Sequence, residues 1–206
     1  MTETAIATRE QLRGYLKEHS VRHGDFQLAS GQRSNVYIDA KLTTCRAQAM
    51  PLVGRVFLAK MFDRGWHPDA VGGLTLGADP IAAAIARESV TEVPPIDFFV
   101  VRKEPKKHGL QKYLEGLPAP EGLRVVVVDD VCTTGGSTIK AVQCCREAGM
   151  TILGAVCLVD REQGAKQALA DLSCPFESIF TLQELVSEPG PAGASSLQQR
   201  PSCRAE

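Results

Sequence analysis

Buried strand patterns alternate with amphipathic segments over most of the chain. Near-continuous apolar runs rich in Val and Ile predict strands at 69–74, 96–101, 124–129 and 152–159. Apolar residues at helical spacing predict helices at 79–89, 136–148 and 162–172, with Asp79 as an N-cap. A further helix is predicted before the first of these strands, with Pro51 near its first turn and Gly65 at its end. This alternation indicates an α/β fold, a parallel sheet flanked by helices.

The N-terminal part follows a different pattern. Thr8 and Gln11 form a capping box, which predicts a helix from there to about His19. Between residues 25 and 40, a Ser-Gly turn separates two short β-prone pieces, so we expect a small hairpin-like element. At the other end, residues 187–206 are rich in Pro, Gly and Ser and are predicted to be a disordered tail. We therefore expect one folded domain over residues 1–186.

Composition excludes several classes of protein. A chain of 206 residues with 44% hydrophobic residues is long enough for one ordinary core. Its formal net charge of −1 argues against a general nucleic-acid or membrane binder. No run is apolar enough to span a bilayer, and the N-terminus lacks the apolar core of a signal peptide. The 7 cysteines include no CxxC pair, so we expect a reduced, cytoplasmic protein rather than a disulfide framework or a zinc site.

The run VVVVDDVCTTGGST, residues 125–138, places chemistry at the end of a strand. Ligands of open parallel sheets bind beyond the carboxyl ends of the strands. The loop that follows leads into a helix whose free N–H groups suit a phosphate monoester, and its glycines allow close approach of the backbone. Hydroxyl groups add further donors, at Thr133, Thr134, Ser137 and Thr138.

Asp129 and Asp130 need a partner other than the phosphate, which they would repel. Neutral ribose hydroxyls fit, because each can donate a charge-assisted hydrogen bond of roughly 1.5–3 kcal/mol. The pattern therefore predicts a ribose 5-phosphate site. In the alternative reading, one Asp caps the helix and the other pairs with a basic neighbour, which leaves the Thr/Gly loop unexplained.

Residues 102–112, RKEPKKHGLQK, form a strongly basic segment. A charge run is usually a solvated face. This one, however, separates two predicted strands, is longer than a median connection, and holds Pro105 and Gly109 as pivots. A mobile basic loop above a sugar-phosphate site would neutralise a pyrophosphate leaving group and exclude water.

These motifs resemble those of a known family. The acid pair with its Thr-Gly-Gly-Ser loop resembles the phosphoribosyl-pyrophosphate (PRPP) signature of the type I phosphoribosyltransferases, although that motif does not choose the acceptor base. The spacing of Arg102, Lys103, Lys106 and His108 is similar to the catalytic loop of the orotate phosphoribosyltransferase family. Residues 26–42 resemble its N-terminal hood, 72–82 its pyrophosphate loop, and Arg161 its orotate-binding arginine.

The resemblance implies a type I phosphoribosyltransferase fold with a small hood, mainly residues 8–45. It also implies transfer of the 5-phosphoribosyl group from PRPP to orotate, giving orotidine 5′-monophosphate (OMP) and pyrophosphate in de novo pyrimidine (UMP) biosynthesis. Mg²⁺ is expected to be bound mainly through PRPP. The expected assembly is a homodimer that shares the 102–112 loop across its interface.

The resemblance also implies roles for individual residues. The catalytic residues would be Lys103, Lys106, His108, Asp129 and Asp130. The PRPP-binding residues would be Arg102, Lys103, Lys106, His108, Asp129, Asp130, Val131, Cys132, Thr133, Thr134, Gly135, Gly136 and Ser137. Orotate would be bound by Tyr37, Ile38, Thr133 and Arg161. The sequence departs from some family members at Ala29 and Leu76, where those members have lysines near the pyrophosphate.

Three rival functions explain less of the sequence. A phosphoribosyltransferase for a purine or uracil needs a different hood and gives no reason for Arg161. A non-enzymatic regulator that binds RNA or DNA should show an added basic face or a DNA-binding domain. A bifunctional enzyme that also decarboxylates its product needs a second domain, and the run DAKLTT at 39–44 ends in Thr where a decarboxylase Asp-x-Lys-x-x-Asp pattern needs an acid. Association with a separate decarboxylase stays open.

Overall fold

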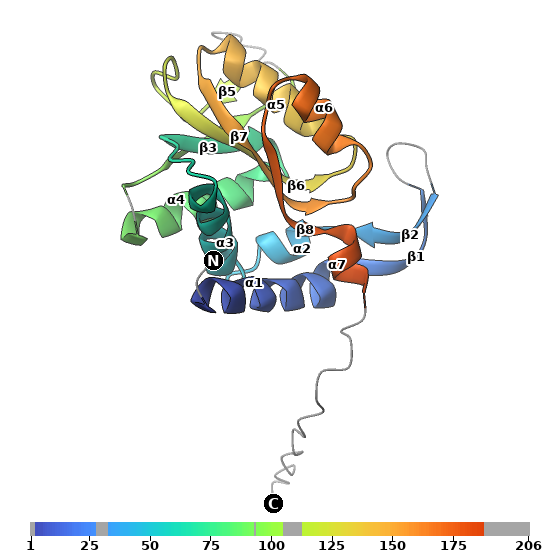
Figure 1. Cartoon of the computed structure of the whole chain (residues 1–206). Coiled ribbons are helices and arrows are strands. Elements are labelled where there is room, and N and C mark those ends of the chain that lie inside the picture. Colours follow the sequence, from blue (N-terminus) through green and yellow to red (C-terminus); the bar gives the residue numbers. More distant parts are fainter. Residues whose placement is uncertain (1–2, 28–32, 93, 105–112, 188–206) are drawn as a thin grey trace, which may run out of the picture.

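The computed structural model describes residues 3–27, 33–92, 94–104 and 113–187, and these form a three-layer α/β/α structure (Figure 1). The central sheet has six strands in the order β5-β4-β3-β6-β7-β8, all parallel except β5. Its strands are β3 (Ala70–Leu74), β4 (Asp97–Val101), β5 (Leu114–Glu115), β6 (Arg124–Cys132), β7 (Thr151–Asp160) and β8 (Phe176–Thr181). The predicted parallel sheet is confirmed, and its strand order reverses beside β3, where such sheets bind ligands.

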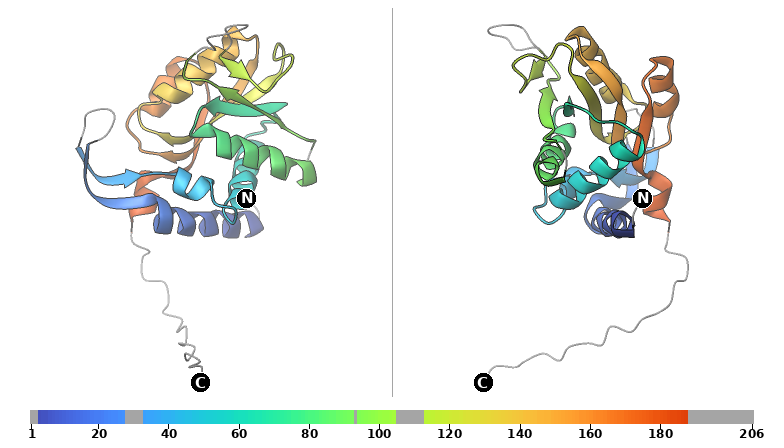
Figure 2. Two further views of the ribbon diagram at one scale, coloured as in Figure 1. Left: turned by 180° about the vertical axis from the view of Figure 1, so that it is seen from behind. Right: turned by 60° about the vertical axis from the view of Figure 1, so that its left-hand side comes forward.

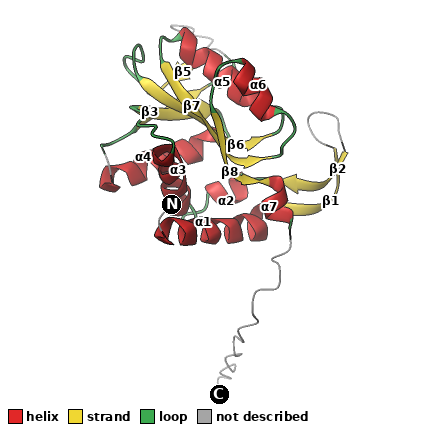
Figure 3. Ribbon diagram, in the orientation of Figure 1, coloured by secondary structure: helices red, strands yellow, loops and turns green. Residues whose placement is uncertain are grey.

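Helices cover both faces of the sheet (Figures 2 and 3). One face carries α3 (Met50–Asp63) and α4 (Ala78–Glu92), and the other carries α5 (Gly136–Glu147) and α6 (Ala165–Asp171). The valines of β6 divide between the two layers, because successive side chains of a strand point to opposite faces. Val126 and Val128 join the α3/α4 core, whereas Val125 and Val127 join the α5/α6 core, and all four are fully buried. The continuous valine run is therefore a strand buried on both faces.

The N-terminal hood packs beside this sheet. Its elements are α1 (Glu3–Tyr15), a π-helical turn η1 (Leu16–Ser20), β1 (Val21–Gln27), β2 (Arg33–Ile38) and α2 (Lys41–Thr44). The strands β1 and β2 pair antiparallel, which confirms the predicted hairpin, although the Ser-Gly turn lies outside the described residues. A hydrogen bond of 2.7 Å between the Ser20 and Thr43 hydroxyls joins the end of η1 to α2.

Three predicted helix starts are wrong. The helix α6 begins at Ala165 rather than at residue 162, because Gly164 has a left-handed φ of 104°. The first helix begins at Glu3 rather than at Thr8, because helix-compatible residues precede Thr8, and the Thr8 hydroxyl donates to the Thr4 carbonyl instead of capping. The helix α4 begins at Ala78, so Asp79 lies in its first turn, where its Oδ2 accepts the Thr75 hydroxyl at 2.7 Å. The sequence reading also assigned no element to β5, β8 or the final helix α7 (Leu182–Val186), which Thr181 and Glu184 begin with a capping box.

None of the helices that the structure describes combines the length and apolar character needed to cross a membrane.

Candidate active site

The Thr/Gly loop after β6 lines a small cavity of about 180 Å³ at the carboxyl end of the sheet. The loop turns from the strand into α5 at Gly135, which has a left-handed φ of 84° that favours glycine. The cavity is lined by Asp129, Val131, Cys132, Thr133, Thr134, Gly135, Gly136 and Ser137. The predicted strand, loop and helix are therefore present in the arrangement that a phosphate needs, with the first turn of α5 at the cavity wall.

The two adjacent acids differ in their surroundings. Asp129 is only 4% exposed. Its Oδ2 accepts the Thr138 hydroxyl at 2.8 Å, and its Oδ1 accepts the backbone N–H of Asp130 at 3.0 Å. Burial, and then the neighbouring Asp130 carboxylate, raise the pKa of Asp129 to about 7. Asp129 thus links the end of β6 to the first turn of α5.

The Asp130 carboxylate lies closer to the surface and meets two other segments. Its Oδ1 accepts the backbone N–H of Val131 at 2.9 Å, and its Oδ2 lies 3.5 Å from Nζ of Lys41 in the hood. The 72–82 segment packs against it so closely that a Cβ added at Gly77 would lie 2.3 Å from Oδ1. The hood, the 72–82 segment and the end of β6 therefore converge at this carboxylate.

The first residues of the basic segment are anchored between β4 and β5. The backbone N–H of Arg102 donates to the Tyr113 carbonyl at 2.8 Å, and its guanidinium pairs with Glu115 at 3.3 Å. Lys140 of α5 donates to the Lys103 carbonyl. Arg102 and Lys103 line a cavity of about 730 Å³ together with Thr75, Leu76, Val100, Glu104 and Glu115. The start of the basic segment thus adjoins the 72–82 segment.

Several predicted site residues lie outside the described residues. These are Lys106 and His108 of the basic segment; Ala29, a departure from the family pattern with no predicted role, also lies outside them. Leu76, the other departure from the family pattern, is described and is 67% exposed.

Arg161 follows β7 and lies against the hood. It is 7% exposed, and its Nη2 donates to the Ser34 hydroxyl at 3.1 Å and to the Val36 carbonyl at 3.4 Å. Its Nε is buried and has no hydrogen-bond partner in the part of the chain that is described. Burial lowers the pKa of Arg161. A buried guanidinium with an unused donor suits a planar anion such as a carboxylate.

The two predicted ring-covering residues of the hood point in opposite directions, as alternation along β2 requires. The Tyr37 side chain is 43% exposed, and its ring packs against Phe26 at a centroid distance of 5.5 Å. The Ile38 side chain is buried in the core shared with α1 and α3. Of the two, Tyr37 is therefore the residue whose side chain is exposed.

No three His, Cys, Asp or Glu side chains of the described residues are grouped so that they could hold a metal ion. The acid pair does not form a ready-made chelate, since both Asp129 oxygens and one Asp130 oxygen accept protein hydrogen bonds. The remaining Asp130 oxygen lies 3.5 Å from the Lys41 ammonium group. Mg²⁺, which prefers oxygen ligands and retains waters, would therefore be bound mainly by the oxygens of a sugar diphosphate.

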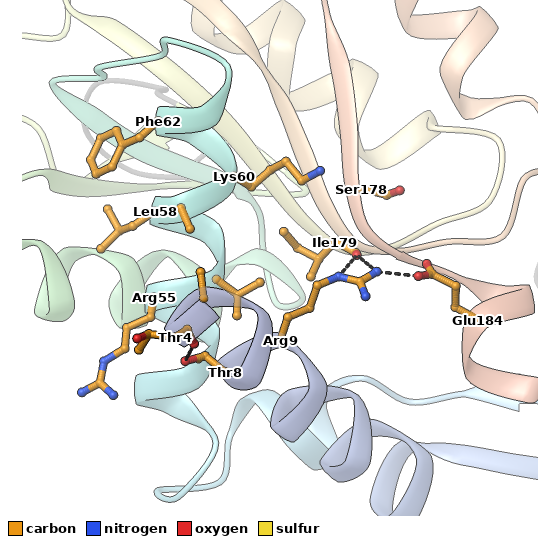
Figure 4. A pocket seen from close by; sticks show the side chains of 13 residues that line it. Thr4, Thr8, Arg9, Arg55, Leu58, Lys60, Phe62, Ser178, Ile179 and Glu184 are labelled. Carbon is orange, nitrogen blue, oxygen red and sulfur yellow. Dashed lines mark hydrogen bonds and ion pairs between the residues drawn. The ribbon is translucent and has the colours of Figure 1, made fainter. Parts of the chain in front are cut away.

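A further cavity of about 510 Å³ lies away from the strand ends, between α1, α3, β8 and α7 (Figure 4). Its polar groups serve the fold. Arg9 donates to the Ile179 carbonyl and pairs with Glu184, while Lys60 pairs with Glu177 at 3.6 Å and Arg55 with Glu88 at 3.0 Å. The charged side chains that line this cavity are thus engaged in contacts within the fold.

Two residues of the site were not predicted from sequence, Lys41 and Gly77. Both stand inside segments that resemble the family, 26–42 and 72–82, but only the fold shows that both meet Asp130.

The fold and the site define a class. A strand that ends in two acids, followed by a Thr/Gly loop and a helix at the reversal of a parallel sheet, is the arrangement of a phosphoribosyltransferase. The family model for the phosphoribosyl transferase domain matches residues 46–184. The chain is 45% identical over 183 residues to the orotate phosphoribosyltransferase of Aquifex aeolicus, covering 86% of this chain and 97% of that protein. It is 42% identical to the enzyme of that name from Corynebacterium glutamicum, covering 87% and 95%.

A solved structure of the Mycobacterium tuberculosis orotate phosphoribosyltransferase in complex with PRPP is also similar. It has a TM-score of 0.71 and 35% sequence identity, over 86% of this chain and 98% of that one. The chain belongs to the orotate phosphoribosyltransferase family.

Proposed function

We propose that the protein is an Mg²⁺-dependent glycosyltransferase that transfers the 5-phosphoribosyl group of PRPP to orotate, giving OMP and pyrophosphate in UMP biosynthesis. The observation that carries the choice of base is Arg161. Its guanidinium is buried at the hood with an unused donor, as a site for the orotate carboxylate requires. Purines and uracil have no carboxylate to meet it. The names of the relatives support the same choice.

The loop 133–137 binds the 5-phosphate through the amides of the first α5 turn and through hydroxyl groups. The Asp130 carboxylate, with an oxygen directed at the hood, accepts hydrogen bonds from ribose hydroxyls. Asp129 lies further inside and accepts the Thr138 hydroxyl of α5. Both carboxylates favour the positive charge that develops at C1 as its bond to pyrophosphate breaks.

The basic segment 102–112 neutralises the departing pyrophosphate. Arg102 and Lys103 stand beside the 72–82 segment, and Lys106 and His108 continue the same segment. Because orotate N1 is already acidic, little general-base work is needed, and His108 serves as a charge or proton donor to the leaving group.

Tyr37 covers the orotate ring, Thr133 borders it, and Arg161 holds its carboxylate. Mg²⁺ would be held mainly by PRPP oxygens, with Asp130 as the nearby protein carboxylate, and would supply charge neutralisation for the pyrophosphate.

The protein is further proposed to be a cytoplasmic homodimer of one domain over residues 1–186, with no nucleic-acid or membrane partner. The face around β4 supports a dimer. Phe98 is 41% exposed, and Val100, two residues along on the same face of the strand, lines a cavity with the exposed Leu76. Apolar surface next to Arg102 and Lys103 would place a partner beside the basic segment.

Mixing two inactive variants tests whether the loop is shared. Refolding Lys106→Ala together with Arg161→Ala should restore about a quarter of wild-type activity. Random pairing makes half of the dimers mixed, and each mixed dimer has one site with both an intact Arg161 and an intact partner loop. No recovery would mean that each site uses its own loop.

The function itself is tested by consumption of orotate with PRPP, with and without Mg²⁺, beside adenine, hypoxanthine and uracil. Mg²⁺-dependent turnover of orotate alone, with OMP as product, is the expected result. Turnover of another base would keep the PRPP site and overturn the role of Arg161. Binding of PRPP without turnover of any base would favour a regulator.

A further inference from the structure

Lys41 joins the hood to the acid pair. It is the first residue of α2, two residues after Asp39 and three after the end of β2. Its Nζ lies 3.0 Å from Asp39 Oδ1 and 3.5 Å from Asp130 Oδ2. The Lys41 side chain is 45% exposed and that of Asp130 is 16% exposed. The ammonium group therefore bridges a carboxylate of the hood and a carboxylate near the end of β6.

The charge of Lys41 opposes the repulsion between the two adjacent acids. Among the cations that the structure describes, Lys41 is the one within ion-pair distance of Asp130. Burial lowers the pKa of Lys41, but Asp39 and Asp130 outweigh it and raise the pKa above its ordinary value. The ammonium group thus stays charged at neutral pH and places a positive charge beside the Asp130 carboxylate.

The Asp130 carboxylate is fixed on its other sides by the protein. The Val131 amide holds Oδ1, and the close approach of Gly77 limits movement in that direction. Oδ2 is the oxygen without a backbone donor, so Lys41 decides where it points.

We propose that Lys41 is a positioning residue for PRPP and OMP, which holds Asp130 Oδ2 toward the ribose hydroxyls and couples the hood to ribose binding. The proposal rests on the proposed function, because it assumes that Asp130 receives a ribose. Lys41 acts through Asp130 and not on the pyrophosphate.

The reverse reaction separates these two roles, because OMP carries ribose hydroxyls without a pyrophosphate, and free pyrophosphate has no ribose. In Lys41→Met, we expect the KM for OMP and the KM for PRPP to rise about fivefold, the scale of a partly exposed charge pair. The KM for pyrophosphate should stay within about twofold. Lys41→Arg should keep all three near wild type, as should the control Lys17→Met, whose Nζ contacts only the Ser187 carbonyl among the described residues.

A double-mutant cycle tests the route through Asp130. Lys41→Met should add little to the loss already caused by Asp130→Asn. A rise in the KM for PRPP and for pyrophosphate, but not for OMP, would make Lys41 a pyrophosphate ligand and overturn the proposal. If Asp39→Asn raised the KM for PRPP and for OMP as much as Lys41→Met does and also lowered the melting temperature, Lys41 would only stabilise the hood, and the proposal would be overturned. Wild-type protein that turns over neither PRPP nor OMP would instead refute the proposed function, and the inference with it.

Discussion

Gly77 should be intolerant of any side chain because of Asp130. A Cβ at residue 77 would lie 2.3 Å from Asp130 Oδ1 and 2.5 Å from its Cγ. Ordinary contacts between such atoms are about 3.5 Å, so the carboxylate or the 72–82 segment has to move by roughly 1 Å. Asp130 has little freedom to move, because Val131 and Lys41 hold its two oxygens.

The magnitude follows from the hydrogen bond at risk. A displacement of this size removes about one charge-assisted bond between Asp130 and a ribose hydroxyl, roughly 1.5–3 kcal/mol. That corresponds to a loss of PRPP affinity of roughly 10- to 150-fold. The free energy of unfolding should change by less than about 1 kcal/mol, since the clash lies at the site and not in the core.

The assay is the initial rate of orotate consumption by Gly77→Ala over a range of PRPP concentrations, beside urea unfolding. The control is Gly14→Ala in α1, where an added Cβ has no atom within 4 Å. In an Asp130→Asn background, Gly77→Ala should raise the KM for PRPP by a smaller factor than in the wild type, because the two changes affect one contact. An unchanged KM for PRPP in Gly77→Ala would refute the reasoning.

Two further predictions concern charged groups. Arg161→Gln should raise the KM for orotate at least tenfold and leave the KM for PRPP within about twofold. Initial-rate measurements that showed equal rises in the two KM values would contradict binding of the orotate carboxylate by Arg161. Asp129 has a pKa of about 7 in the fold and an ordinary value of 3.8, so the native state retains a proton that the unfolded chain has lost. Wild-type stability should therefore fall as the pH rises from about 4 to about 7, and Asp129→Asn should lack this part of the slope. Urea unfolding at pH 5 and pH 7.5 measures the free energy of unfolding of the wild type and of Asp129→Asn. The same pH dependence in the two proteins would contradict a protonated Asp129.

The strands of the sheet interior were predictable because their signal is local. A run such as 125–128, apolar at every position, has to be buried on both faces. The element β8 gives a weaker signal, since three of its six residues are half-exposed at its start and it pairs only with β7 among the described strands. The two residues of β5 owe their strand geometry to pairing with β4, which no local pattern specifies.

The candidate site was predictable to the extent that its residues are contiguous. Asp129, Asp130 and the loop after them stand in one run, and the order of strand, loop and helix defines their geometry. The contacts of Asp130 with Lys41 and Gly77 join segments far apart in the chain. Only the packing of the hood onto the sheet brings them together, so no spacing rule could have revealed them.

That packing also separates the roles of two acids that the sequence presents as equivalent. Neighbouring side chains leave a strand in opposite directions, so one acid turns inward and the other turns toward the hood. A ribose hydroxyl that reached Asp129 would compete with Thr138, whose hydroxyl already occupies Oδ2, and with the Asp130 amide on Oδ1. Asp130 Oδ2 meets no such competition from the backbone and has a cation beside it. Loss of the Asp129 carboxyl group should therefore disturb the loop 133–137, and loss of the Asp130 carboxyl group should disturb sugar binding.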